Sequence, residues 1–153
     1  MKISKHISYK EATFSATAIR KGIDNIPNDY HIQNMKLIAE KVFEPLREWA
    51  GSPIAVNSFF RSEALNRAIK GASGSQHMQG RAIDIDDTFG GKSNKEMFEY
   101  IVKHLDFDQI IWEFGDDKNP DWIHVSYVSE DQNRKAILRA KKVNGKTHYE
   151  KFV

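Results

Sequence analysis

The sequence contains no cysteine among its 153 residues. This absence excludes disulfide scaffolds, cysteine nucleophiles, thiol redox chemistry, cysteine zinc sites and iron–sulfur clusters. A transition metal would therefore have to be held by histidine and carboxylate side chains. Long apolar runs are missing as well: no window of about 18 apolar residues could span a bilayer, so we expect no membrane insertion.

The sequence also lacks an excess of either charge. It has 23 basic and 21 acidic residues and a net charge of +2, far from the basic stripe typical of nucleic-acid binders, so we expect no nucleic-acid partner. A chain of this length buries roughly 68–70% of its surface on folding and needs no metal for that purpose. Because repeats and linkers are also missing, we expect one monomeric domain over residues 1–153, in which any metal would serve chemistry.

Apolar residues recur every three or four positions over residues 31–49, which predicts a helix that faces the core. Pro45 is expected to kink or split this helix. Two further helices are expected after Ser62 and Ser93, and Glu96 completes a capping box with Ser93. A weaker signature of the same kind begins at Ser8.

Short β-branched or aromatic runs predict strands in the second half of the chain, and Asn144-Gly145 predicts a hairpin turn near its end. The expected strands cover residues 54–58, 82–86, 109–114 and 122–127, and the expected hairpin joins 136–143 to 146–152. These patterns favour an α+β fold, in which helices pack on one face of a small, mostly antiparallel sheet.

Two of these strands carry candidate metal ligands. Alternation places Asp84 and His124 opposite to their apolar neighbours, so both side chains share one face if the strands are adjacent. His77 lies seven residues before Asp84, and Gly80 between them permits a tight turn back. Two imidazoles, one carboxylate and an open position are the ligand set of a catalytic zinc site, and we expect one Zn²⁺ per chain.

A metal-activated water needs a base, and Asp121 lies three residues before His124 on the same short segment. Positions 121 and 124 have opposite parity in an extended strand. Asp121 is therefore expected to precede regular pairing, in a turn shaped by Asn119-Pro120. Glu113 is the alternative base, because it lies opposite to the apolar side chains of its own strand.

The sequence around these residues resembles the zinc D-alanyl-D-alanine carboxypeptidases and their relatives, which include dipeptidases and phage endolysins that cut peptidoglycan peptides. Residues 75–84 match the family pattern Ser-x-His-x-x-Gly-x-Ala-x-Asp, and residues 121–124 match its acid-x-x-His pattern. Residues 58–62 are similar to the family's strand end with its substrate-binding arginine. The resemblance extends from about Thr17 to Tyr127.

The resemblance implies a hedgehog/DD-peptidase fold and a role for each matched residue. It assigns zinc to His77, Asp84 and His124, the general base to Asp121, and substrate contacts to Arg61, Ser75 and Gln76, with Arg61 also orienting the substrate or stabilising oxyanion charge. The sequence departs from the common pattern at Phe60, where tyrosine is frequent, and at Asp121, where many members carry glutamate.

The expected function is therefore a zinc metallopeptidase that hydrolyses peptide bonds in peptidoglycan stems, as a carboxypeptidase or an endopeptidase. The alternative is a non-catalytic zinc-binding domain of the same fold that recognises peptide or cell wall. The N-terminus lacks the apolar segment of a secretory signal. We therefore expect synthesis in the cytoplasm and action on the cell wall after release during phage lysis.

Two other groups of residues have more than one interpretation. Trp112 and Trp122 would either stack on substrate or belong to the core. A basic cluster near the C-terminus is expected to be a solvated face, with attraction of anionic wall polymers as a second possibility; it comprises Arg134, Lys135, Arg139, Lys141 and Lys142.

Overall fold

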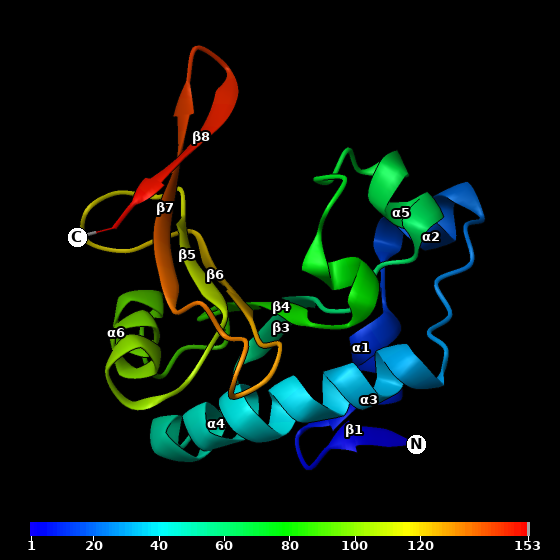
Figure 1. The fold of residues 1–153 in the computed structure, drawn as a ribbon, viewed down its shortest axis with the longest axis horizontal. Coiled ribbons are helices and arrows are strands. Elements are labelled where there is room, and N and C mark those ends of the chain that lie inside the picture. Colours follow the sequence, from blue (N-terminus) through cyan, green and yellow to red (C-terminus); the bar gives the residue numbers. More distant parts are fainter. Residues whose placement is uncertain (153) are drawn as a thin grey trace.

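A six-stranded sheet forms the centre of the protein (Figure 1), and the computed structural model describes residues 1–152. The strand order is β3-β4-β6-β5-β7-β8, and all neighbours are antiparallel except β5 and β7. The strands are β3 (Ala55–Ser58), β4 (Ala82–Asp86), β5 (Gln109–Glu113), β6 (Trp122–Ser126), β7 (Ala136–Val143) and β8 (Lys146–Lys151). The expected strands and the mostly antiparallel sheet are confirmed.

The C-terminal hairpin extends this sheet rather than standing apart from it. Asn144 and Gly145 both have positive φ, at 53° and 77°, as a two-residue hairpin turn with this dipeptide requires. The paired strands β7 and β8 project beyond the remainder of the sheet (Figure 1). Because β7 pairs with β5, the hairpin begins beside the centre of the sheet and ends in solvent.

Helices and a small ribbon complete the fold. The two-stranded ribbon consists of β1 (Lys2–Ser4) and β2 (Ile7–Ser8), which the sequence patterns did not indicate. The helices are α1 (Tyr9–Thr13), α2 (Ala16–Lys21), α3 (Asp29–Ile38), α4 (Glu44–Ala50), α5 (Glu63–Ala68) and α6 (Asn94–His104), with a 3₁₀ turn η2 (Gln76–Gln79). Ser8, Ser62 and Ser93 cap α1, α5 and α6 as predicted.

The long helix expected over residues 31–49 is present but is not split at Pro45. A π-helical turn, η1 (Ala39–Phe43), joins α3 to α4 directly before the proline. Proline has no N–H to donate to the preceding turn, so regular α-helical bonding cannot continue unchanged through Pro45. The wider turn accommodates this loss while the apolar stripe stays on the core.

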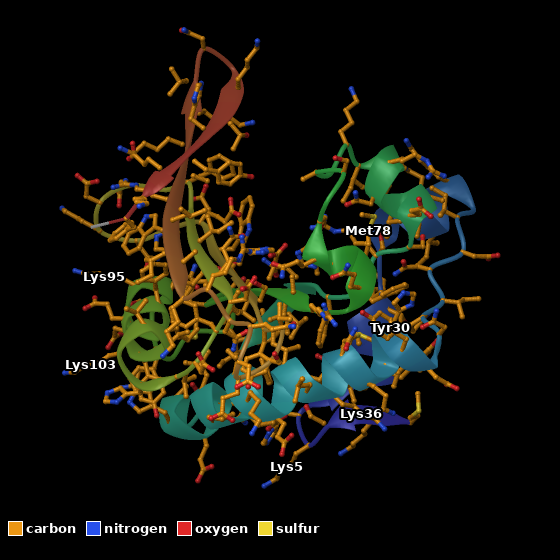
Figure 2. All side chains as sticks on the ribbon, viewed as in Figure 1. Lys5, Tyr30, Lys36, Met78, Lys95 and Lys103 are labelled. Atoms are coloured by element: carbon orange, nitrogen blue, oxygen red, sulfur yellow. The ribbon has the colours of Figure 1, made fainter. Side chains whose placement is uncertain are left out.

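One face of the sheet meets the helices, and the other face carries the polar site. Apolar side chains of the long helix and α6 share a core with Ile83, Ile85, Ile123 and Val125. On the outer side of α6, Lys95 and Lys103 point away from the sheet (Figure 2). The α+β architecture is thus confirmed. No helix within residues 1–152 combines the length and apolarity needed to cross a membrane.

Candidate metal centre

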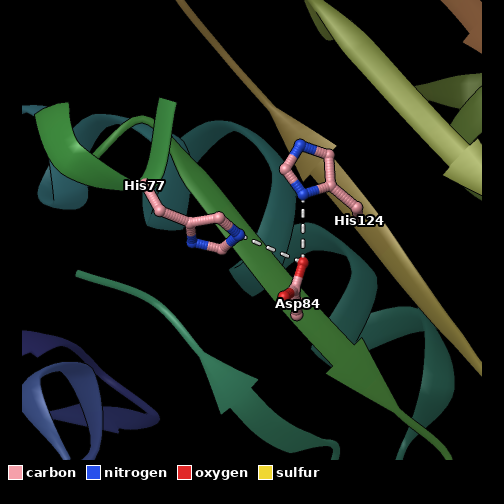
Figure 3. A group of neighbouring side chains, drawn as sticks. All are labelled: His77, Asp84 and His124. Atoms are coloured by element: carbon pink, nitrogen blue, oxygen red, sulfur yellow. Dashed lines mark hydrogen bonds and ion pairs between the residues drawn. The ribbon is translucent and has the colours of Figure 1, made fainter. Parts of the chain in front are cut away.

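Three predicted ligands converge on the face of the sheet opposite the helices (Figure 3). Asp84 and His124 are direct cross-strand partners in β4 and β6. The Oδ1 atom of Asp84 lies 3.0 Å from Nδ1 of His124 and 3.2 Å from Nε2 of His77. All three candidate ligand atoms lie within 4.8 Å of one another, so one ion could contact all of them.

The turn before β4 brings His77 back to the sheet. Ser75 caps the η2 turn, and Gly80 ends it with a φ of 73°. A Cβ at position 80 would lie 2.5 Å from the carbonyl oxygen of His31, so glycine is required both by conformation and by space. Gly80 therefore lets the η2 turn pack closely against the backbone of His31, and this turn places His77 beside Asp84.

A backbone contact fixes the ring of His77. Its Nδ1 lies 2.7 Å from the carbonyl oxygen of Phe59, which can only accept a hydrogen bond, so Nδ1 carries the proton. The unprotonated Nε2 then faces Asp84 as a ligand atom. Such an outer partner for a metal-binding histidine orients the ring and raises its basicity.

The protonation of these groups also fits a metal site. Burial lowers the pKa of His77, which favours the neutral imidazole that a metal requires. Burial alone would raise the pKa of Asp84, but the charges and hydrogen bonds of His77 and His124 hold it far below its usual value. An ionised carboxylate and a neutral buried imidazole are thus available at neutral pH.

The ligand set leaves coordination positions open. Among the described residues, the cluster contains two histidines and one carboxylate and no fourth protein ligand. Structural zinc sites are normally filled by four protein ligands, whereas catalytic sites keep a position for water or substrate. The three side chains therefore fit a catalytic metal.

A cavity of about 620 Å³ opens over the three ligands. The predicted substrate residues Arg61, Ser75 and Gln76 all line it. Arg61 lies 3.6 Å from Asp84 and donates hydrogen bonds to Ser58 and Asn66. The ligands, an arginine and polar side chains thus share one space that could hold a peptide.

Comparison with known families agrees with this geometry. A family model described as Peptidase M15 matches residues 5–126, which include the three ligands, Arg61 and Glu113. The chain belongs to the M15 peptidase family. This membership implies the hedgehog/DD-peptidase fold that the sequence resemblance indicated, and a peptide as substrate. None of the curated proteins matches the chain.

The structure of this M15 peptidase does not bring Asp121 into the cavity. Asp121 precedes β6 as predicted, but its side chain is exposed and does not line the cavity. Its amide donates to the carbonyl of Glu113, so the ladder already extends to this residue. The alternation of the strand therefore holds, and Asp121 has the parity of Ile123 rather than that of His124.

Glu113 occupies the place beside the ligands that was expected for Asp121. It is a cross-strand partner of Trp122 in β6, and paired residues lie on the same face of the sheet. His124 lies two residues after Trp122 and therefore shares this face with Glu113. Glu113 lines the cavity and is only 7% exposed. Burial raises the pKa of its carboxyl to about 7, against the lowering effect of His124.

The C-terminal region adds cavity residues to which the sequence analysis assigns no role in the site. Arg134, Leu138 and Tyr149 line the cavity, and all three lie beyond the segment that matches the M15 family. Arg134 is exposed, as the prediction of a solvated face requires, and it also lines the cavity. Its role as a cavity residue depends on the parallel pairing of β7 with β5, for which a single sequence carries no local signal.

The two tryptophans have different environments. Trp112 is buried and packs against Phe98 and Phe152, which confirms the core interpretation. Trp122 is partly buried, packs against Phe114 and does not line the cavity, so the structure gives no support for substrate stacking. The other histidines, His6, His31, His104 and His148, lie outside the metal cluster.

Proposed function

We propose that this M15 peptidase is a zinc enzyme that hydrolyses peptide bonds in the peptide stems of bacterial peptidoglycan. The observation that carries the proposal is the convergence of His77, Asp84 and His124 in a cavity that also holds Glu113. The motif resemblance of residues 75–84 and 121–124 supports zinc as the metal and a wall peptide as the substrate.

His77 Nε2, Asp84 Oδ1 and His124 Nδ1 would hold the ion. A zinc ion there would supply Lewis-acid polarisation of the scissile carbonyl and would lower the pKa of a water molecule. The hydrogen bond from His77 to the Phe59 carbonyl keeps one ligand in position before substrate arrives. The chain thus contributes a rigid ligand set, since two of its members lie on paired strands.

Glu113 is the general base in this proposal, in place of Asp121. Its carboxylate accepts the proton of the attacking water and donates that proton to the leaving amine. Burial raises the pKa of this carboxyl in the metal-free protein, which brings it nearer to the operating pH and favours both proton transfers. Arg61 lies in the same cavity and can stabilise the negative charge that develops on the carbonyl oxygen.

The cellular setting is part of the proposal. Peptidoglycan lies outside the cytoplasmic membrane, so an enzyme that acts on it must reach the wall. Synthesis in the cytoplasm followed by release during phage lysis would bring such an enzyme to the wall. The resemblance to endolysins supports this setting.

The test is mass spectrometry of purified peptidoglycan fragments after incubation with the zinc-loaded protein, with and without a chelator. Chelator-sensitive loss of a terminal D-alanine would identify a carboxypeptidase. Chelator-sensitive cleavage within the stem or the cross-bridge would identify an endopeptidase. Bound zinc without any product would overturn the proposal and favour the non-catalytic binding domain.

A further inference from the structure

A buried carboxylate connects two parts of the cavity wall. The side chain of Asp108 is 2% exposed, yet it accepts hydrogen bonds from two side chains that line the cavity. Arg134 donates from Nε and Nη2 at 3.0 and 2.7 Å, and Gln76 donates from Nε2 at 3.0 Å. Gln76 precedes the ligand His77, whereas Arg134 precedes β7, so Asp108 joins segments that are 58 positions apart.

The interaction with Asp108 leaves part of the Arg134 guanidinium free. Asp108 occupies the edge formed by Nε and Nη2, and no described residue accepts a hydrogen bond from Nη1. The Arg134 side chain is 60% exposed and lines the cavity. The end of the guanidinium, with N–H groups on Nη1 and Nη2, is therefore available for a second carboxylate.

Loop stability explains only part of this arrangement. Asp108 Oδ1 accepts from the backbone amide of Arg134 at 2.9 Å, and the Asp108 carbonyl accepts from the amide of Ala136. These backbone contacts already fix the segment before β7. The ion pair compensates the charge of the buried Asp108 carboxylate, and it also orders the guanidinium before a ligand binds.

The position of the guanidinium relates it to the metal ligands. Arg134 precedes Ala136, the cross-strand partner of Gln109, which also lines the cavity. Gln109 stands two positions before Ile111, the partner of His124, a separation of about 7 Å along β5. Asp108, which holds the guanidinium, is the residue before Gln109 and lies about 10 Å from Ile111 along the chain, so a group bound there would lie within about three peptide residues of a bond placed over the ligands.

We infer that Arg134, positioned by buried Asp108, is a specificity residue that binds a free carboxylate of the substrate within about three residues of the scissile bond. The inference rests on the proposed function, since the substrate is taken to be a wall peptide. Asp108 acts through Arg134 and Gln76 and is a positioning residue. The free carboxylate is either the C-terminus of the stem or that of an internal acidic residue.

The test uses four synthetic stem peptides, in which the C-terminus and the internal acidic residue are each either free or amidated. Binding and cleavage of each peptide are measured with the zinc-loaded protein. Amidation of the recognised carboxylate should raise KM and Kd roughly 10- to 100-fold, as expected for charged hydrogen bonds, and change kcat less. The amide that weakens binding identifies the source of the carboxylate.

Variants assign this effect to Arg134. Arg134→Met should weaken binding of the free peptide to the level of the amidated peptide, and Arg134→Lys should restore part of it. Asp108→Asn should produce an intermediate rise in KM with unchanged zinc affinity. The matched control is Lys135→Met, since Lys135 is the next residue, is 66% exposed and does not line the cavity.

The outcomes separate this inference from the proposed function. Cleavage that is equally efficient with free and amidated peptides would overturn the inference and leave the proposed function intact. Carboxylate-dependent binding that requires Arg134, without cleavage, would support the inference and overturn the proposed function. Failure of all four peptides to bind would overturn both.

Discussion

Nδ1 of His77 lies 2.7 Å from the carbonyl oxygen of Phe59, a residue at the end of the strand segment that precedes α5. This contact commits Nε2 of His77 to the interior of the site, where it meets Asp84. The backbone therefore sets the orientation of this ring. The three metal-binding side chains are thus held in position to bind an ion, although they come from distant parts of the sequence.

His77→Ala should abolish tight zinc binding. Loss of an outer partner alone typically costs ~10–100-fold in metal affinity, so loss of a ligand should cost more than ~100-fold. Competition with a chromophoric chelator measures this, and zinc should raise the thermal midpoint of the wild type but not of the variant. His148→Ala is the matched control, because His148 is exposed on β8 and lies outside the metal cluster. Equal zinc affinity in both variants would contradict the assignment.

Glu113→Gln should retain zinc but lose at least ~10²-fold in kcat, the usual contribution of a general base. Asp121→Asn should have activity close to that of the wild type, since Asp121 is exposed and outside the cavity. Steady-state kinetics on a defined stem peptide and zinc analysis of both proteins provide the comparison. The reverse pattern, in which Asp121→Asn shows the large loss in kcat, would identify Asp121 as the general base.

The raised pKa of Glu113 predicts a pH-dependent difference in the stability of the metal-free protein. Because the folded pKa is about 7 and the ordinary value is 4.5, folding favours the protonated form, and this contribution is lost as pH rises through 7. The loss is on the order of 3 kcal/mol at most. Glu113→Gln should therefore gain stability relative to the wild type between pH 5 and 8.

Urea unfolding of both metal-free proteins across that range measures this difference. Comparison with the variant is needed because burial also lowers the pKa of His77, which stabilises the fold as pH rises through its titration. Bound zinc should reduce the difference, since a nearby cation lowers the pKa of Glu113. A constant difference from pH 5 to 8 in the metal-free proteins would contradict the burial argument.

Gly80→Ala should destabilise the protein by more than ~1 kcal/mol, because alanine is disfavoured at positive φ and its Cβ would lie 2.5 Å from a backbone oxygen. Zinc affinity should fall with it, since Gly80 ends the turn that carries His77. Gly74→Ala is the control, because a Cβ there meets nothing within 4 Å. Chemical denaturation and chelator competition test both effects, and equal stability of the two variants would contradict them.

Local patterns predicted most of the secondary structure because their causes are local. Ser93 and Glu96 cap α6 through contacts three residues apart, and Asn144-Gly145 forms its turn from its own φ preferences. The ribbon of β1 and β2 escaped prediction because its strands are two or three residues long. Such short segments do not reveal a period.

The sequence distinguishes the two candidate bases less well than it identifies the ligands. Alternation gives Asp121 and His124 opposite parity, whereas the acid-x-x-His motif assigns the base to Asp121. The pairing of β5 with β6 settles where each carboxylate lies, since it puts Glu113 opposite Trp122. Strand neighbours are a long-range property, and parity within one strand cannot supply them.

The sequence by itself determined the metal-ligand chemistry, the helical period of the long helix and the alternation of the strands. Without cysteine, only histidine and carboxylate were available, and the spacing of His77, Gly80 and Asp84 implied a turn back onto a strand. The tertiary structure alone decided that Glu113 faces the ligands and that Asp108 holds Arg134 at the cavity. The physical reason is that residue type and alternation act within a few residues, whereas cavity walls form from strands and loops whose pairing is fixed by packing of the whole core.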